Sequence, residues 1–92
     1  MTTTSRPASH DAPSIEALRA QLARLRCDRV AALRPLKNAK AQLADLARAH
    51  APESARAPVR SRRDAHAQAV RQLSREIELI ARQLAGLTEG ER

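Results

Sequence analysis

Hydrophobic residues recur at alternating steps of three and four along the first half of the chain. The series runs through Ile15, Leu18, Leu22, Leu25, Arg29, Ala32, Leu36, Ala39, Leu43, Leu46 and His50. Positions with this spacing lie on one face of an α-helix, as in the seam of a coiled coil. We therefore predict a first helix over residues 14–51, with the Ser14 hydroxyl as its N-cap and Glu16 at the positive end of its dipole.

A second series of the same spacing follows in the second half of the chain, and it is the more regular of the two. It comprises Val70, Leu73, Ile77, Ile80, Leu84 and Leu87. Ser61 and Asp64 have the spacing of a capping box, and Gly86 suits a left-handed helix end. The pattern predicts a second helix over residues 61–86 that starts at Pro58 or Ser61, with residues 88–92 frayed.

Prolines mark the boundary between the two series. Pro52 and Pro58 interrupt the apolar repeat, so we expect a turn over residues 52–60. Two long helices joined by a short turn form an antiparallel hairpin. The predicted fold is therefore an all-α, coiled-coil-like hairpin over residues 14–87, with Ala39 near Val70 and Leu25 near Leu84.

Pro35 lies inside the first helix and cannot donate a backbone hydrogen bond to the carbonyl of Ala31. We predict that the first helix is kinked or broken at Pro35, and a kink is favoured because no turn-forming residue adjoins it. A break would produce a three-helix bundle instead. We also expect the proline to turn Arg29 outward from the seam; the alternative is that Arg29 stays there and specifies register or partner.

The core available to such a hairpin is narrow. Aromatic residues are absent, and residues 1–13 are too polar to fold, so we expect a disordered tail there. The residues expected to form the core or to drive self-association are Leu18, Leu22, Leu25, Leu36, Leu43, Leu46, Val70, Leu73, Ile77, Ile80 and Leu84. Ala67, Ser74 and Ala81 flank the second seam and would allow another helix to approach, which favours a homo-oligomer or a protein partner.

The net charge of +7 adds an attraction to acidic surfaces. Its densest cluster lies at the predicted tip of the hairpin and comprises Arg48, Arg56, Arg60, Arg62 and Arg63. These arginines are the predicted anion- or partner-binding residues. No aromatic residue accompanies them to stack on bases, so any nucleic-acid contact is expected to go to phosphates and to be independent of sequence.

Catalytic and metal-binding patterns are missing from the sequence. Cys27 is the single cysteine and falls on the outer face of the first helix, whereas His10, His50 and His66 have no ligand at helical spacing. We expect no enzyme activity, no cofactor and no metal. The chain contains no signal-peptide pattern and no apolar run that would cross a membrane, which predicts a cytoplasmic protein with no membrane contact.

These observations favour a non-enzymatic helical-hairpin module for protein interaction or assembly, such as a small regulator, adaptor or inhibitor. Its Arg-rich tip would meet an acidic partner. The alternative is an accessory protein that binds DNA or RNA without sequence preference, and it rests on the net charge and its clustering.

Overall fold

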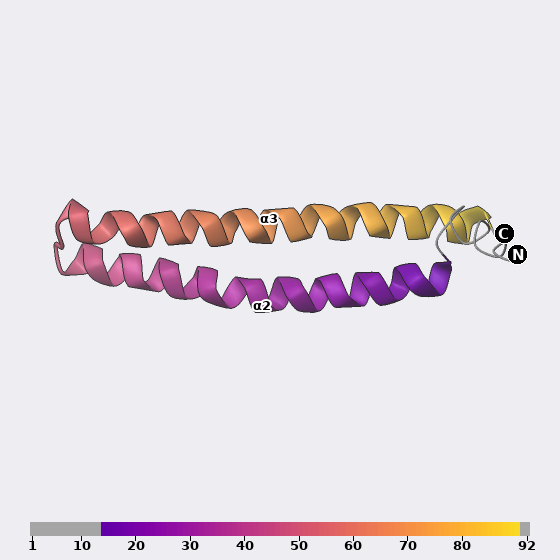
Figure 1. The fold of residues 1–92 in the computed structure, drawn as a ribbon, viewed down its shortest axis with the longest axis horizontal. Coiled ribbons are helices and arrows are strands. Elements are labelled where there is room, and N and C mark those ends of the chain that lie inside the picture. The colour runs from indigo at the N-terminus through magenta and orange to yellow at the C-terminus, as the bar shows by residue number, and fades with distance from the viewer. Residues whose placement is uncertain (1–13, 91–92) are drawn as a thin grey trace, which may run out of the picture.

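The computed structural model describes residues 14–90, which form two long helices. Helix α2 spans Ile15–Arg48 and α3 spans Glu53–Gly90. Figure 1 shows them side by side and antiparallel, so that the end of α3 lies beside the start of α2. The predicted all-α hairpin is confirmed. The tail expected over residues 1–13 and the last two residues lie outside the described part.

The start of α2 is set by the predicted cap. Ser14 has extended backbone angles, and its hydroxyl oxygen accepts a hydrogen bond of 3.0 Å from the backbone N–H of Ala17. This bond satisfies one of the donors that the first turn of a helix leaves free. Glu16 follows in the first turn, where a carboxylate is favoured by the helix dipole.

The end of α2 is a tight left-handed closure around His50. The N–H of His50 donates to the carbonyl of Ala47 at 3.0 Å, and the N–H of Ala51 donates to the carbonyl of Leu46 at 2.9 Å. His50 has a φ of 55°, so this pair of bonds forms a Schellman motif. The chain therefore reverses within residues 49–52, and the expected helix end at 51 and turn over 52–60 are wrong.

Helix α3 begins directly after Pro52 and continues through Pro58. Pro58 leaves the carbonyl of Ser54 without its helical donor, but both residues are exposed, so water can satisfy that oxygen. The expected start at Pro58 or Ser61 is therefore wrong, and so is the cap at Gly86. Gly86 lies inside α3, which continues through Thr88 and Glu89 to Gly90.

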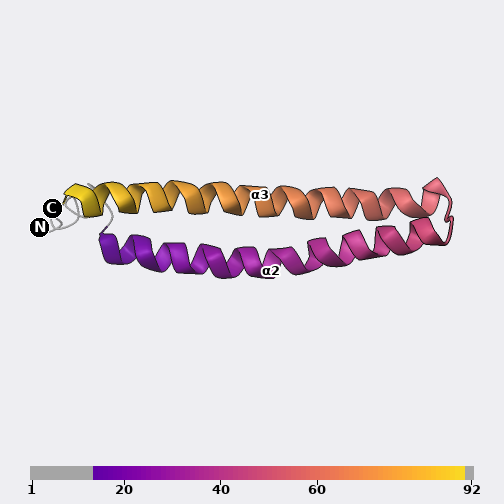
Figure 2. The same cartoon turned by 180° about the vertical axis from the view of Figure 1, so that it is seen from behind.

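Helix α2 is continuous through Pro35, so the predicted break and the three-helix bundle are both wrong. The carbonyl that loses its donor belongs to Ala31, which is exposed to solvent. Figure 2 shows α2 bowing away from α3 in its middle and returning at both ends. A helix that is convex toward solvent opens its outer hydrogen bonds in this way. A kink localised at Pro35 stays a prediction.

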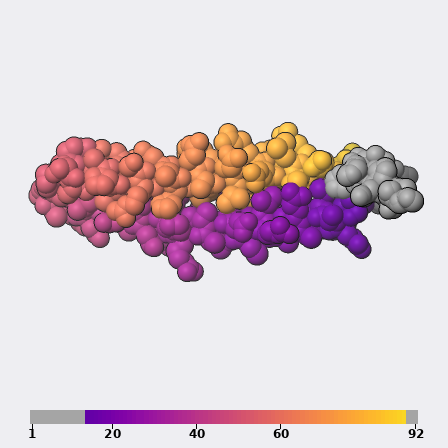
Figure 3. Space-filling view, in the orientation of Figure 1, coloured from indigo at the N-terminus to yellow at the C-terminus, as the bar shows by residue number. Residues whose placement is uncertain are grey.

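The core is one line of side chains between the two helices, whose surfaces meet along the hairpin in Figure 3. The buried hydrophobic residues among those described are Leu18, Leu22, Leu36, Ala39, Val59 and Val70. The other predicted core residues, Leu25, Leu43, Leu46, Leu73, Ile77, Ile80 and Leu84, are half-buried. Val59 extends the seam of α3 toward the tip, where we had expected a turn.

The short reversal also changes which residues stand opposite one another. Arg29 hydrogen-bonds to Ser74, and Arg62 hydrogen-bonds to Gln42. Arg26 and Ile77 line the same hollow, so Leu25 lies near Ile77 rather than near Leu84. The predicted pairings of Ala39 with Val70 and of Leu25 with Leu84 are both wrong, because they assumed a longer turn and the register of a hairpin follows its turn.

The backbone of His50 provides a test of the closure. A non-glycine residue with positive φ is strained, so His50→Gly should raise the free energy of unfolding by about 1 kcal/mol. Gly86 is helical with open space around its Cβ position, so Gly86→Ala should stabilise α3 by a similar amount, about 1 kcal/mol. Urea unfolding followed by circular dichroism measures both changes. Destabilisation by His50→Gly would contradict the Schellman closure.

Candidate interaction surface

The five arginines predicted at the tip are divided between the two helices. Arg48 ends α2, whereas the other four, Arg56, Arg60, Arg62 and Arg63, lie in the first turns of α3. Arg56, Arg60 and Arg63 are half-buried along the edge of the seam, and Arg62 points across it to Gln42 of α2. Three of the five, Arg56, Arg60 and Arg63, lie on one face of α3, because they are separated by steps of four and three.

Each tip arginine also has an acceptor within the chain. Arg48 pairs with Asp45, and Arg63 pairs with Asp64 at 2.9 Å. Arg56 donates from its Nε to the backbone carbonyl of Ala51 at 2.9 Å, which ties α3 to the closure of α2. Exposed pairs of this kind contribute little stability, roughly 0–1 kcal/mol each, so an incoming acidic group can replace them.

The contact between Arg60 and Glu53 has two hydrogen bonds. The two guanidinium nitrogens donate to the two carboxylate oxygens at 2.6 and 3.0 Å. The hydrogen bond from Arg60 lowers the pKa of Glu53, and Glu53 raises the pKa of Arg60. The pair joins the first and second turns of α3, on either side of Pro58, where one backbone bond is missing.

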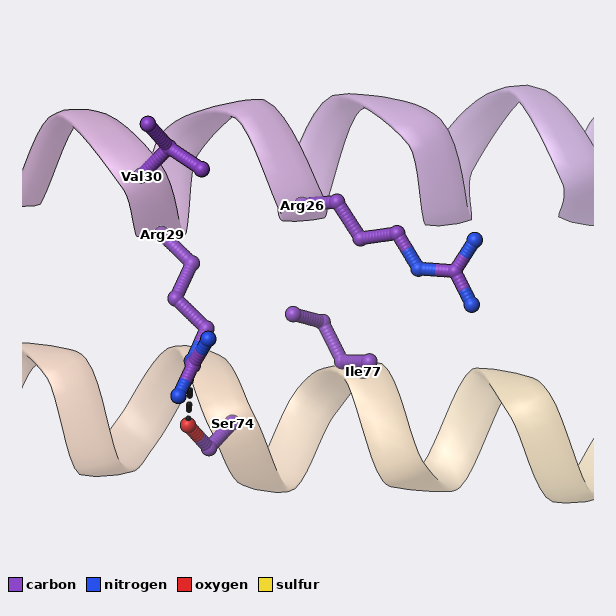
Figure 4. A pocket seen from close by; sticks show the side chains of 5 residues that line it. All are labelled: Arg26, Arg29, Val30, Ser74 and Ile77. Atoms are coloured by element: carbon purple, nitrogen blue, oxygen red, sulfur yellow. Dashed lines mark hydrogen bonds between the residues drawn. The ribbon is translucent and has the colours of Figure 1, made fainter.

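Arg29 stays in the seam rather than turning outward, so that expectation is wrong. Figure 4 shows its side chain crossing from α2 to α3, where Nε donates to the Ser74 hydroxyl at 2.8 Å. The bond is partly buried. A polar residue at a seam position that finds one partner across the interface favours a single register. Ser74 is one of the small residues that flank the seam, and Arg29 occupies the space beside it.

Open hollows surround this crossing. One is lined by Arg26, Arg29, Val30, Ser74 and Ile77, and a second shares Arg29 and Ser74 and adds Val70, Arg71 and Arg75. A third lies further along α2 and is lined by Leu33, Leu36, Lys37 and Lys40. The three linings combine aliphatic side chains with six cations and contain no carboxylate.

This surface is not among the predicted binding residues, although its signal is present in the sequence of α2. A second set of residues at steps of three and four runs beside the seam: Arg19, Ala23, Arg26, Val30, Leu33, Lys37, Lys40, Ala44 and Ala47. We call this set the basic stripe. All nine residues are exposed. Four cations and no carboxylate give the stripe a formal charge of +4.

The residues considered for catalysis and metal binding do not converge. Cys27 is exposed on α2, His50 lies in the turn, and His66 is half-buried in α3, whereas His10 is outside the described residues. Within residues 14–90, no group of three histidine, cysteine or acidic side chains is close enough to hold a metal ion. Neither helix contains an apolar stretch that would cross a bilayer.

Comparison with protein families, with curated proteins and with solved structures found no match to this chain.

Removing the polar crossing tests its role in the seam. Arg29→Leu places an aliphatic residue at a seam position and should raise the free energy of unfolding by about 1 kcal/mol. A double-mutant cycle of Arg29→Ala and Ser74→Ala should give a coupling energy of about 1 kcal/mol, because the two form one hydrogen bond. Unfolding in urea measures all variants, and additive effects in the cycle would show that the bond does not form in solution.

The pair of Glu53 and Arg60 predicts a pH effect at the tip. Because the folded-state pKa of Glu53 is lowered, its contribution to stability is complete above the pKa in the unfolded chain. The contribution is lost as the pH falls through the folded-state value. A carbon-detected NMR titration should show a depressed pKa for Glu53 and its return toward the ordinary range in Arg60→Gln. An unchanged titration in that variant would contradict the pair.

Proposed function

We propose that the chain is a non-enzymatic helical-hairpin module that completes its packing on another protein. The observation that carries this proposal is the incomplete core. Six hydrophobic side chains of the described residues are buried, while Val30, Leu33 and Leu79 are 68%, 37% and 59% exposed. Two helices in contact along one line bury little apolar area, and scaffolds of this size are usually stabilised further by association.

The charge pattern favours a partner with acidic groups. The chain carries +7, and its cations lie on both the tip and the basic stripe. The tip arginines hold weak exposed contacts that a partner carboxylate can exchange for its own. The tip is then an additional contact for the partner, and the exposed aliphatic residues of α2 supply the apolar part of the interface.

The alternative is non-specific binding of DNA or RNA through phosphate contacts. It is supported by the net charge, but a phosphate backbone makes no use of exposed Val30 and Leu33. The protein partner could be a second copy of the chain, which would form a homo-oligomer. Sedimentation of the purified protein distinguishes such self-association from binding to a different protein.

Capture from the native host tests the proposal against its alternative. The tagged full chain should retain a protein in stoichiometric amount after nuclease treatment, at an ionic strength near physiological. The nucleic-acid alternative would be favoured by two results together. Nuclease treatment would remove all bound material, and a variant with Ala in place of Arg60, Arg62 and Arg63 would bind duplex more weakly. The proposal would be overturned if the purified chain sediments as a stable, folded monomer and the capture experiment retains no protein.

A further inference from the structure

The two sides of α2 differ sharply in charge. The flank opposite the basic stripe consists of Ala17, Gln21, Arg24, Asp28, Ala31, Pro35, Asn38, Gln42 and Asp45. One cation and two carboxylates give this polar flank a formal charge of −1, against +4 for the stripe. Both sets flank the same seam with the same spacing, so they lie on opposite sides of the hairpin.

The basic stripe also contains the exposed aliphatic residues of α2. Val30 and Leu33 lie at its centre, between Arg26 and the pair Lys37 and Lys40. The hollow in Figure 4 opens beside Val30, and Ile77 of α3 points into it from the other helix. An apolar centre with cations on both sides along one helix is the pattern of a surface that another helix covers.

We propose that the basic stripe is the docking site for an acidic amphipathic helix of a different protein. This inference rests on the proposed function and names its site and partner chemistry. The aliphatic side chains of the partner would lie over Val30, Leu33 and the Ile77 hollow, and its carboxylates would meet Arg26, Lys37 and Lys40. The stripe from Arg26 to Lys40 is about 20 Å long at 1.5 Å per residue, which matches a partner helix of about four turns.

Charge complementarity selects this occupant over the others. A second copy of the chain would bring another stripe of +4 against the first, so like charges would meet along the contact. Nucleic acid and an anionic membrane satisfy the cations as well. The regular spacing of the stripe and the hollows between its side chains favour a helix, whose own side chains fit into such gaps.

Binding of a designed peptide tests the site. The peptide has about two heptads, which is the length of the contact from Arg26 to Lys40, with Leu at the seam positions, Glu at the flanking positions and one Trp. The chain contains no aromatic residue, so the fluorescence of that Trp reports binding without background. The Glu peptide should bind to the full chain, and a peptide with Lys in place of Glu should not.

Two charge-reversal variants locate the contact. Arg24 and Arg26 are both exposed on α2, but Arg24 lies on the polar flank and Arg26 on the stripe. Arg26→Glu and Arg24→Glu change the net charge equally. Arg26→Glu should lower the affinity for the Glu peptide about tenfold, and Arg24→Glu should change that affinity less than about twofold. Val30→Gln with Leu33→Gln should also weaken binding about tenfold, with the circular dichroism of every variant unchanged.

Equal weakening by the two charge reversals, or full binding by the Val30 and Leu33 double variant, would overturn the stripe assignment. The assignment would also be overturned if duplex DNA or phosphatidylglycerol vesicles, added at the same concentration of negative charge, bound more tightly than the peptide and displaced it. If the peptide fails to bind while capture from the native host yields a protein partner, the stripe assignment is wrong and the proposed function stands. If the peptide does not bind and capture from the native host yields no protein partner, the stripe assignment and the proposed function are both wrong.

Discussion

The reversal of the chain within residues 49–52 is the constraint on which the rest of the structure depends. Once His50 adopts a left-handed conformation and Pro52 starts the next helix, the register of α2 against α3 is set. That register brings Arg29 opposite Ser74 and Arg62 opposite Gln42. A turn longer by one heptad repeat would move every one of these pairs.

The narrow seam has a consequence for the surface. With two helices and no aromatic residue, the hairpin covers one face of each helix and leaves the flanks of the seam open. On one flank the polar residues are neutral or of mixed sign. On the other flank, cations surround Val30 and Leu33, whose exposed aliphatic side chains have nothing to pack against in a hairpin that functions alone. The cations of the basic stripe and the exposed Val30 and Leu33 therefore lie on the same side of the molecule.

Much of the fold could be predicted from the sequence, because apolar spacing specifies helices and their inner faces. The seam positions of α2 and the Ser14 cap follow directly from that pattern. The position of the turn could not be predicted, since its left-handed residue is a histidine and Arg63 and His66 conceal the continuation of the α3 seam to Val59. The residues of the basic stripe have helical spacing in the sequence, but the stripe can be recognised only after the seam residues beside it have been assigned. The inward position of Arg29 could not be predicted, because Pro35 removes a helical hydrogen bond nearby and α2 nevertheless continues through it.

The antiparallel packing of α2 on α3 within one chain is tested most directly by a distance measurement between spin labels. One label is placed on exposed Cys27 and the other on Arg75→Cys, with an excess of unlabelled chain to remove distances between molecules. The structure predicts a narrow distribution below about 30 Å, since packed helices lie roughly 8–10 Å apart and the labels add to that distance. A distribution centred near 70 Å, the separation along one continuous helix at about 1.5 Å per residue, would contradict the hairpin.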